Sequence, residues 1–181
     1  MIGSRPNERS ARAAQRGFVL RFILIAAVLF ALYSFPYAEN GLSERWFDAY
    51  LSGYARIAGD VFAIFERGVI VTQNVIAGRF SLRIVKSCDA MEVNLLFCTA
   101  VLAYPARVLQ KFAAVSLGLT TLVAVNVLRI CCLYFAGVFL PSWFELLHFE
   151  VWPLLLVVYA SALFFGWIVW VRRSEPALAS D

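Results

Sequence analysis

The stretch FAAVSLGLTTLVAVNVLRICCLYFA, residues 112–136, decides the fold. It has no formal charge from Phe112 to Leu128, and as a helix it is long enough to cross a hydrocarbon core about 30 Å thick. The whole chain has the same character, because 62% of its residues are hydrophobic, 15% are charged and the mean hydropathy is +0.76. Soluble domains are about half apolar and a quarter charged, so the sequence predicts an all-α integral membrane protein.

About four transmembrane helices are expected, over residues 17–35, 89–106, 112–136 and 149–171. The net charge is +4, but the basic residues form no single patch, which argues against nucleic acid as a partner and leaves membrane lipid. They precede the first span, lie between the second and third, and follow the last. By the positive-inside rule, both termini are then cytoplasmic in a multi-pass protein of the cytoplasmic (inner) membrane, and residues 37–88 and 138–148 lie outside.

Three regions follow from this layout: a basic cytoplasmic tail without regular structure over 1–16, a membrane-embedded domain over 17–171, and a cytoplasmic tail over 172–181. A basic start followed by an apolar core is also typical of a cleaved signal peptide. The apolar stretch is long for that, however, and residues 35–38 (FPYA) lack a small-x-small cleavage site. An uncleaved anchor is therefore favoured.

The outer segment 37–88 divides into two predicted elements. Residues 41–65 have a helical period, with apolar residues on one face and charges on the other, and the apolar face is predicted to comprise Leu42, Trp46, Tyr50, Gly53, Ile57, Val61 and Ile64. The charges make a lipid-exposed span costly, so this amphipathic helix lies flat in the interface or packs re-entrantly against the spans. Residues 68–85 are rich in β-branched side chains, and apolar residues alternate with polar ones towards the end of the segment. With a turn at Ala77-Gly78, this pattern predicts a small β-hairpin.

Three side chains from different spans are expected at one depth, near the outer boundary of the membrane. At a helical rise of about 1.5 Å per residue, counted from the inner basic residues, Cys88 lies about 28 Å away, Arg129 about 27 Å and His148 about 36 Å. The outer boundary lies about 30 Å from the inner one, so a thiol, a guanidinium and an imidazole are predicted at the same level.

Each of these residues also has an ordinary interpretation: a cysteine that packs, an arginine that reaches the lipid headgroups, and a histidine that is solvated. Cys88 differs from the other cysteines because it begins a helix after Lys86, and both features favour the thiolate. Arg129 ends a long uncharged run, where ionisable residues usually face a polar partner. Asn126, one turn earlier, is expected to orient its guanidinium.

Together, these three residue types are sufficient for acyl transfer. Cys88 is the candidate nucleophile, His148 the acid and base, and Arg129 the group that stabilises the tetrahedral oxyanion. Asp89 and Glu92 flank the cysteine and are candidates to polarise the histidine or to bind a cationic part of a substrate, although solvated acids at a helix start are the simpler interpretation. No cysteine or histidine spacing indicates a metal, and no cofactor is implied.

The same residues resemble the exosortase/archaeosortase family of membrane protein-sorting enzymes, and the compact length is similar to the exosortase H subgroup. The resemblance covers about residues 17–171 and is carried by three segments in order: 84–92 (IVKSCDAME), 126–130 (NVLRI) and 143–148 (WFELLH). It implies a membrane cysteine transpeptidase or protease that cleaves C-terminal sorting signals of exported proteins at the outer face of the membrane.

The resemblance also implies partners and roles. The substrates would be exported proteins that end in a short motif, a transmembrane helix and a basic cluster, and the product would pass to a surface acceptor. Cys88 would be the nucleophile, Arg129 a transition-state or positioning group, and His148 the acid and base.

Two other functions stay open. A membrane thiol oxidoreductase would pair Cys88 with Cys131 or Cys132, although no CxxC motif is present. A non-catalytic membrane scaffold or transporter subunit would leave the common depth of the three polar residues unexplained.

Overall fold

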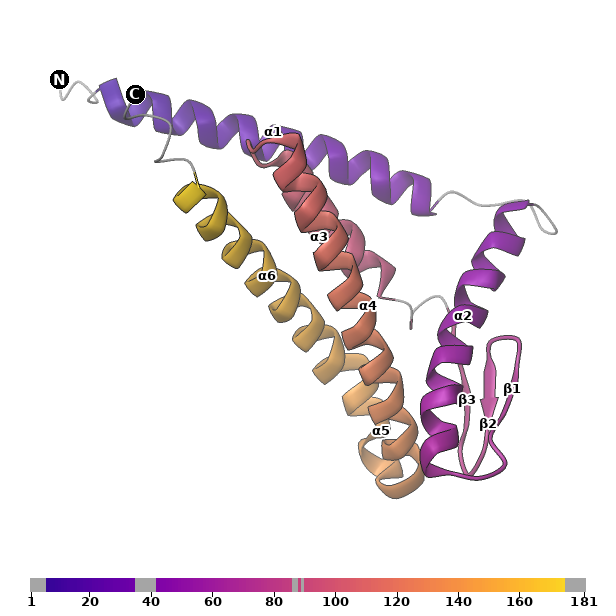
Figure 1. The fold of residues 1–181 in the computed structure, drawn as a ribbon. Coiled ribbons are helices and arrows are strands. Elements are labelled where there is room, and N and C mark those ends of the chain that lie inside the picture. Colours follow the sequence, from indigo (N-terminus) through magenta and orange to yellow (C-terminus); the bar gives the residue numbers. More distant parts are fainter. Residues whose placement is uncertain (1–5, 35–41, 86–87, 89, 175–181) are drawn as a thin grey trace. The chain divides into compact units, whose positions relative to one another are not determined.

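A computed structural model describes residues 6–34, 42–85, 88 and 90–174 (Figure 1). The chain forms two compact units: the first comprises residues 1–35, 92–118 and 160–181, and the second comprises 36–91 and 119–159. Within the described residues, three helical stretches are long and apolar enough to cross a membrane: Gln15–Ser34, Val108–Phe139 and Pro141–Ser174. The expected helical, membrane-type fold is confirmed in this coarse form.

The first unit is built from α1 (Pro6–Ser34), most of α3 (Met91–Ala103), the start of α4 (Val108–Phe139) and the end of α6 (Trp152–Ser174). Aromatic side chains hold it together, since the ring of Tyr104 packs edge-on against Trp167 at 5.6 Å. The ammonium of Lys111 donates a hydrogen bond of 2.7 Å to the carbonyl of Leu102, which satisfies one of the free carbonyls at the end of α3.

Two predictions differ from the observed helices of this unit. Residues 6–16 were expected without regular structure but form the start of α1, because Pro6 suits the first position of a helix and the following alanines favour helix. The second span, predicted over 89–106, is helical only over Met91–Ala103. Thirteen residues rise about 20 Å, which is less than the thickness of the hydrocarbon core.

The second unit combines α2 (Leu42–Phe65) with a three-stranded antiparallel sheet of β1 (Ile70–Thr72), β2 (Val75–Ala77) and β3 (Ser81–Arg83). The expected hairpin with its turn after Ala77 is present as β2 and β3, and a second turn at residues 73–74 adds β1. The predicted alternation holds, since Leu82 and Ile84 are buried while Ser81 and Arg83 are exposed. In Figure 1, α2 lies along this sheet.

The face of α2 that packs against the core coincides only in part with the predicted apolar face. The buried residues are Leu51, Tyr54, Ala55, Ala58 and Phe62. Of the predicted apolar face, Tyr50 and Val61 pack against this core, whereas Ile57 and Ile64 are 51% and 77% exposed. Small side chains allow the sheet to approach the helix closely, and Val71 of β1 lies directly against Gly59. Side-chain size therefore contributes, together with hydrophobicity, to which surface of α2 packs.

The core of the second unit centres on Phe62 and Tyr134, whose rings stack at 4.3 Å. Both side chains are fully buried. The carboxylate of Glu66, just after α2, accepts hydrogen bonds from the Tyr134 hydroxyl at 2.8 Å and from the Arg79 amide at 2.7 Å. A Cβ at Gly78 would meet the same hydroxyl, so this turn needs glycine. One carboxylate thereby links α2, the β2–β3 turn and α4.

We expect Tyr134→Phe to destabilise the protein by about 1–3 kcal/mol, because it removes the hydroxyl that satisfies the Glu66 carboxylate while the ring still packs. Thermal unfolding in detergent measures the change. Tyr159→Phe, which removes a hydroxyl with no hydrogen bond to the described residues, is the matched control. Equal stability of the two variants would show that the Glu66 link contributes nothing.

Candidate active site

Helix α4 places two polar side chains inside the second unit. Asn126 is completely buried and Arg129 is 3% exposed. Residues three positions apart share a face of a helix, with their Cβ atoms about 5–6 Å apart. A buried amide and a buried guanidinium in an apolar helix are expensive unless they are hydrogen-bonded, so their partners indicate what this face of α4 is built to hold.

Asn126 holds the segment that carries Cys88. Its side-chain amide donates a hydrogen bond of 3.0 Å to the backbone carbonyl of Cys88. The Cys88 amide in turn donates to the carbonyl of Val85 at 2.7 Å, which closes a tight turn. The Cys88 side chain is 7% exposed and belongs to the core cluster that also contains Cys131 and Tyr134.

The sheet anchors the other end of the same segment. Asn74 brackets Ile84, since the Asn74 side-chain amide donates to the Ile84 carbonyl and the Ile84 amide donates to the Asn74 carbonyl, both at 2.8 Å. After the cysteine, Ala90 has a φ of 54°, in the left-handed region that costs an alanine about 1–2 kcal/mol. Such strain persists where the surrounding structure fixes the backbone, and it clusters at functional sites.

Arg129 contacts the segment that carries His148. Its guanidinium donates a long hydrogen bond of 3.4 Å to the backbone carbonyl of His148. The imidazole stacks almost parallel on Phe144 at 5.7 Å and lies edge-on to Phe149 at 4.6 Å. Its Nδ1 atom is buried and has no hydrogen-bond partner among the described residues.

The helix changes its winding at this histidine. After the 3₁₀ turn η2 (Pro141–Trp143) and the short α5 (Phe144–Leu146), the π-helical turn η3 (Leu147–Val151) carries His148 and leads into α6. Single π-helical turns are rare and occur frequently at functional sites. The extra residue per turn shifts the imidazole from the position that a regular α-helix would give it.

The structure thus brings Cys88, Asn126, Arg129 and His148 into one unit, through the backbone carbonyls of the cysteine and the histidine. Asn126 was expected to orient Arg129, but its amide instead binds the cysteine segment. Of the other two supporting residues, Asp89 lies outside the described residues, and Glu92 is exposed and belongs to the first unit.

The observed helices agree with the depth estimate for Arg129 but not with that for Cys88. Helix α4 is continuous between Lys111 and Arg129, as the estimate for the arginine assumed. The estimate for Cys88 assumed a helix up to residue 107, whereas α3 covers only Met91–Ala103, so that figure is wrong for the observed backbone.

The remaining cysteines lie in varied surroundings. Cys131 is buried near Cys88, Cys132 is exposed on α4, Cys98 belongs to the first unit, and all four thiols are free. In the described part of the chain, no group of three or more histidine, cysteine or acidic residues is suited to hold a metal ion.

Three features of the site were not predicted from the sequence: the strained Ala90, the π-helical turn and the stacking of Phe144 on the imidazole. The two glutamates near His148 do not indicate the π-helical turn. Only Pro141, shortly before the histidine, indicates that the winding is irregular.

Comparison with known proteins gives no match, since no protein-family model, no curated protein and no solved structure is significantly similar to this chain.

We expect Asn126→Ala to release the Cys88 segment, because a buried carbonyl loses its only described side-chain donor. The variant should be less stable by about 1–3 kcal/mol, and Cys88 should react several-fold faster with iodoacetamide in a Cys98→Ser, Cys131→Ser, Cys132→Ser background. Asn94→Ala removes an equally buried amide from α3 and serves as the control. An unchanged alkylation rate in Asn126→Ala would contradict the assignment.

Proposed function

We propose that this chain is an exosortase-like cysteine transpeptidase or protease, embedded in the cytoplasmic membrane, that processes C-terminal sorting signals of exported proteins. The observation that supports it best is the pair of hydrogen bonds from Asn126 and Arg129 to the carbonyls of Cys88 and His148. One turn of α4 thereby binds both the segment that carries the thiol and the segment that carries the imidazole. A scaffold protein has no need of this arrangement.

The proposed reaction is acyl transfer through a thioester. His148 takes the thiol proton of Cys88, and the sulfur attacks the carbonyl carbon of the scissile peptide bond. The guanidinium of Arg129 stabilises the oxyanion without changing its own charge. The C–N bond then breaks as His148 gives the proton to the leaving amine. Water or an acceptor nucleophile attacks the thioester in a second round and restores the thiol.

The proposed topology has four crossings with both termini in the cytoplasm. Helix α3 is the short crossing in this topology, since its thirteen residues rise about 20 Å. The Lys111 ammonium satisfies the carbonyl of Leu102 at the end of this helix.

This topology would put the reacting groups at the outer surface, where an anchored substrate presents its cleavage site. A substrate that ends in its own transmembrane helix has the preceding motif at the outer boundary. Confinement in the same bilayer replaces a bimolecular encounter by an oriented one, which is a large part of the advantage of a membrane-bound enzyme.

A thiol oxidoreductase is the second candidate, because Cys88 and Cys131 are free thiols in one buried cluster. The two functions differ in what they require. A disulfide-forming enzyme needs both thiols, whereas the transpeptidase needs only Cys88.

Cys88→Ala and Cys88→Ser should each lower processing by at least about 10³-fold, because both variants remove the nucleophile and leave the fold in place. The assay co-expresses the full chain with an exported reporter that carries the motif, apolar helix and arginine cluster from a protein of the same cell, and follows cleavage by immunoblot. Cys131→Ala, a matched buried cysteine, should retain processing. Processing by Cys88→Ala at the wild-type rate would refute the proposal. A single disulfide that involves Cys88, found by counting free thiols under denaturing, non-reducing conditions, would favour the oxidoreductase.

A further inference from the structure

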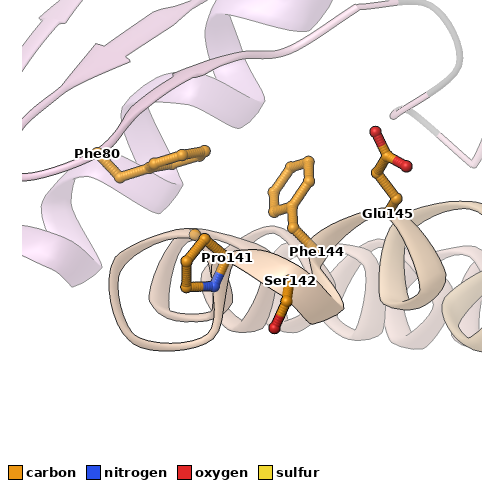
Figure 2. A pocket seen from close by; sticks show the side chains of 6 residues that line it. Phe80, Pro141, Ser142, Phe144 and Glu145 are labelled. Atoms are coloured by element: carbon orange, nitrogen blue, oxygen red, sulfur yellow. The ribbon is translucent and has the colours of Figure 1, made fainter.

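A ring-lined hollow lies in the second unit next to the histidine (Figure 2). Its volume is about 340 Å³, and its lining comprises Phe80, Gly137, Pro141, Ser142, Phe144 and Glu145. In Figure 2 the rings of Phe80, Pro141 and Phe144 surround the space, and the Glu145 carboxylate lies beyond the Phe144 ring. The proposed reaction uses none of these side chains directly.

The hollow depends on one glycine of α4. A Cβ at position 137 would lie 2.6 Å from the ring of Phe80, so glycine allows this ring to rest against the helix. The Phe80 and Phe144 rings are inclined by 51° with their centres 5.5 Å apart, and both line the hollow. The same Phe144 ring stacks on His148, so an occupant of the hollow would lie one ring away from the imidazole.

The chemistry of the lining is amphipathic and negative. Three rings supply apolar contact, and the faces of two phenylalanines attract cations. Glu145 supplies a carboxylate, and no lysine or arginine is among the residues that line the hollow. A side chain with an apolar stem and a positive head matches this lining: the stem lies on the rings and the head reaches the carboxylate.

We propose that the hollow is a specificity subsite that binds a lysine side chain of the substrate polypeptide near its cleavage site. Its role in substrate choice rests on the proposed function, whereas binding to the hollow does not require catalysis. The four methylene groups of lysine lie across Phe80 and Phe144, and the ammonium pairs with Glu145. An apolar side chain of the same length would make the ring contacts but leave the carboxylate without a cation.

Binding is tested with the full-length Cys88→Ala chain in detergent, which lacks the nucleophile and cannot turn over. N-acetyl-lysine methylamide and N-acetyl-norleucine methylamide, which differ only in the terminal ammonium, are titrated and followed by saturation-transfer NMR. We expect a Kd on the order of millimolar for the lysine probe, which has few atoms, and binding about fivefold weaker for the norleucine probe. Glu145→Gln should abolish this difference, and Phe80→Leu should weaken binding of the lysine probe about two- to fivefold.

Glu150→Gln is the matched control, because Glu150 is an exposed acid of the same region that does not line the hollow. It should leave both affinities unchanged. Equal binding of the two probes, or an unchanged difference in Glu145→Gln, would overturn the assignment. Since the nucleophile is absent, this outcome is independent of the processing assay: a processing enzyme that fails the binding test lacks only the lysine subsite.

Discussion

The candidate active site depends on one turn of helix α4, where a buried amide and a buried guanidinium bind the backbone carbonyls of Cys88 and His148. In an apolar surrounding, each of these groups is costly to leave unsatisfied, so the bonds fix which segments lie against the helix. Backbone carbonyls are suitable anchors because hydrogen bonds to them do not occupy the thiol or the imidazole. The same polar pair that is expensive in a membrane helix therefore makes the arrangement specific.

The rest of the second unit supports this turn from outside. The sheet holds Ile84 through Asn74, and the Glu66 carboxylate ties the β2–β3 turn to Tyr134, less than two turns beyond Arg129 on α4. After Ile84, the chain passes through Cys88, whose carbonyl Asn126 binds, and then through the strained Ala90 before α3 begins. Strain of about 1–2 kcal/mol at one residue persists where the surrounding structure fixes the backbone.

Composition and periodicity were sufficient for the coarse fold. Long apolar runs predict the spanning helices, and alternation predicts that Leu82 and Ile84 face the core, because both signals reflect local geometry. The packed face of α2 was predicted only in part, since Tyr50 and Val61 pack against the core, but Ala58 is buried while the more hydrophobic Ile57 is exposed. The length of α3 was overestimated, since the helix ends at Ala103, and the residue before Pro105 already disfavours the helical conformation.

The candidate site, like the fold, could be predicted from the sequence only in part. A charge after a long neutral run made Arg129 a candidate, and its rarity made His148 one, because each stands out against its neighbours; the structure places both in the second unit. Asn126 was assigned to the wrong partner, since the cysteine segment is distant in sequence and helical spacing shows only neighbours on the same helix. The π-helical turn and the ring of Phe144 on the imidazole arise from tertiary packing that no local pattern encodes.

The most direct test of the central claim is chemical cross-linking between positions 88 and 148. In a chain with Cys98, Cys131 and Cys132 changed to serine, native Cys88 is paired with His148→Cys or, as a control, with Ser81→Cys on the exposed side of β3, and treated with a short bismethanethiosulfonate. Mass spectrometry of the digested protein measures the linked peptides. The account predicts rapid linkage of 88 to 148 and little linkage of 88 to 81; linkage to 148 that is no faster than to 81 would contradict it.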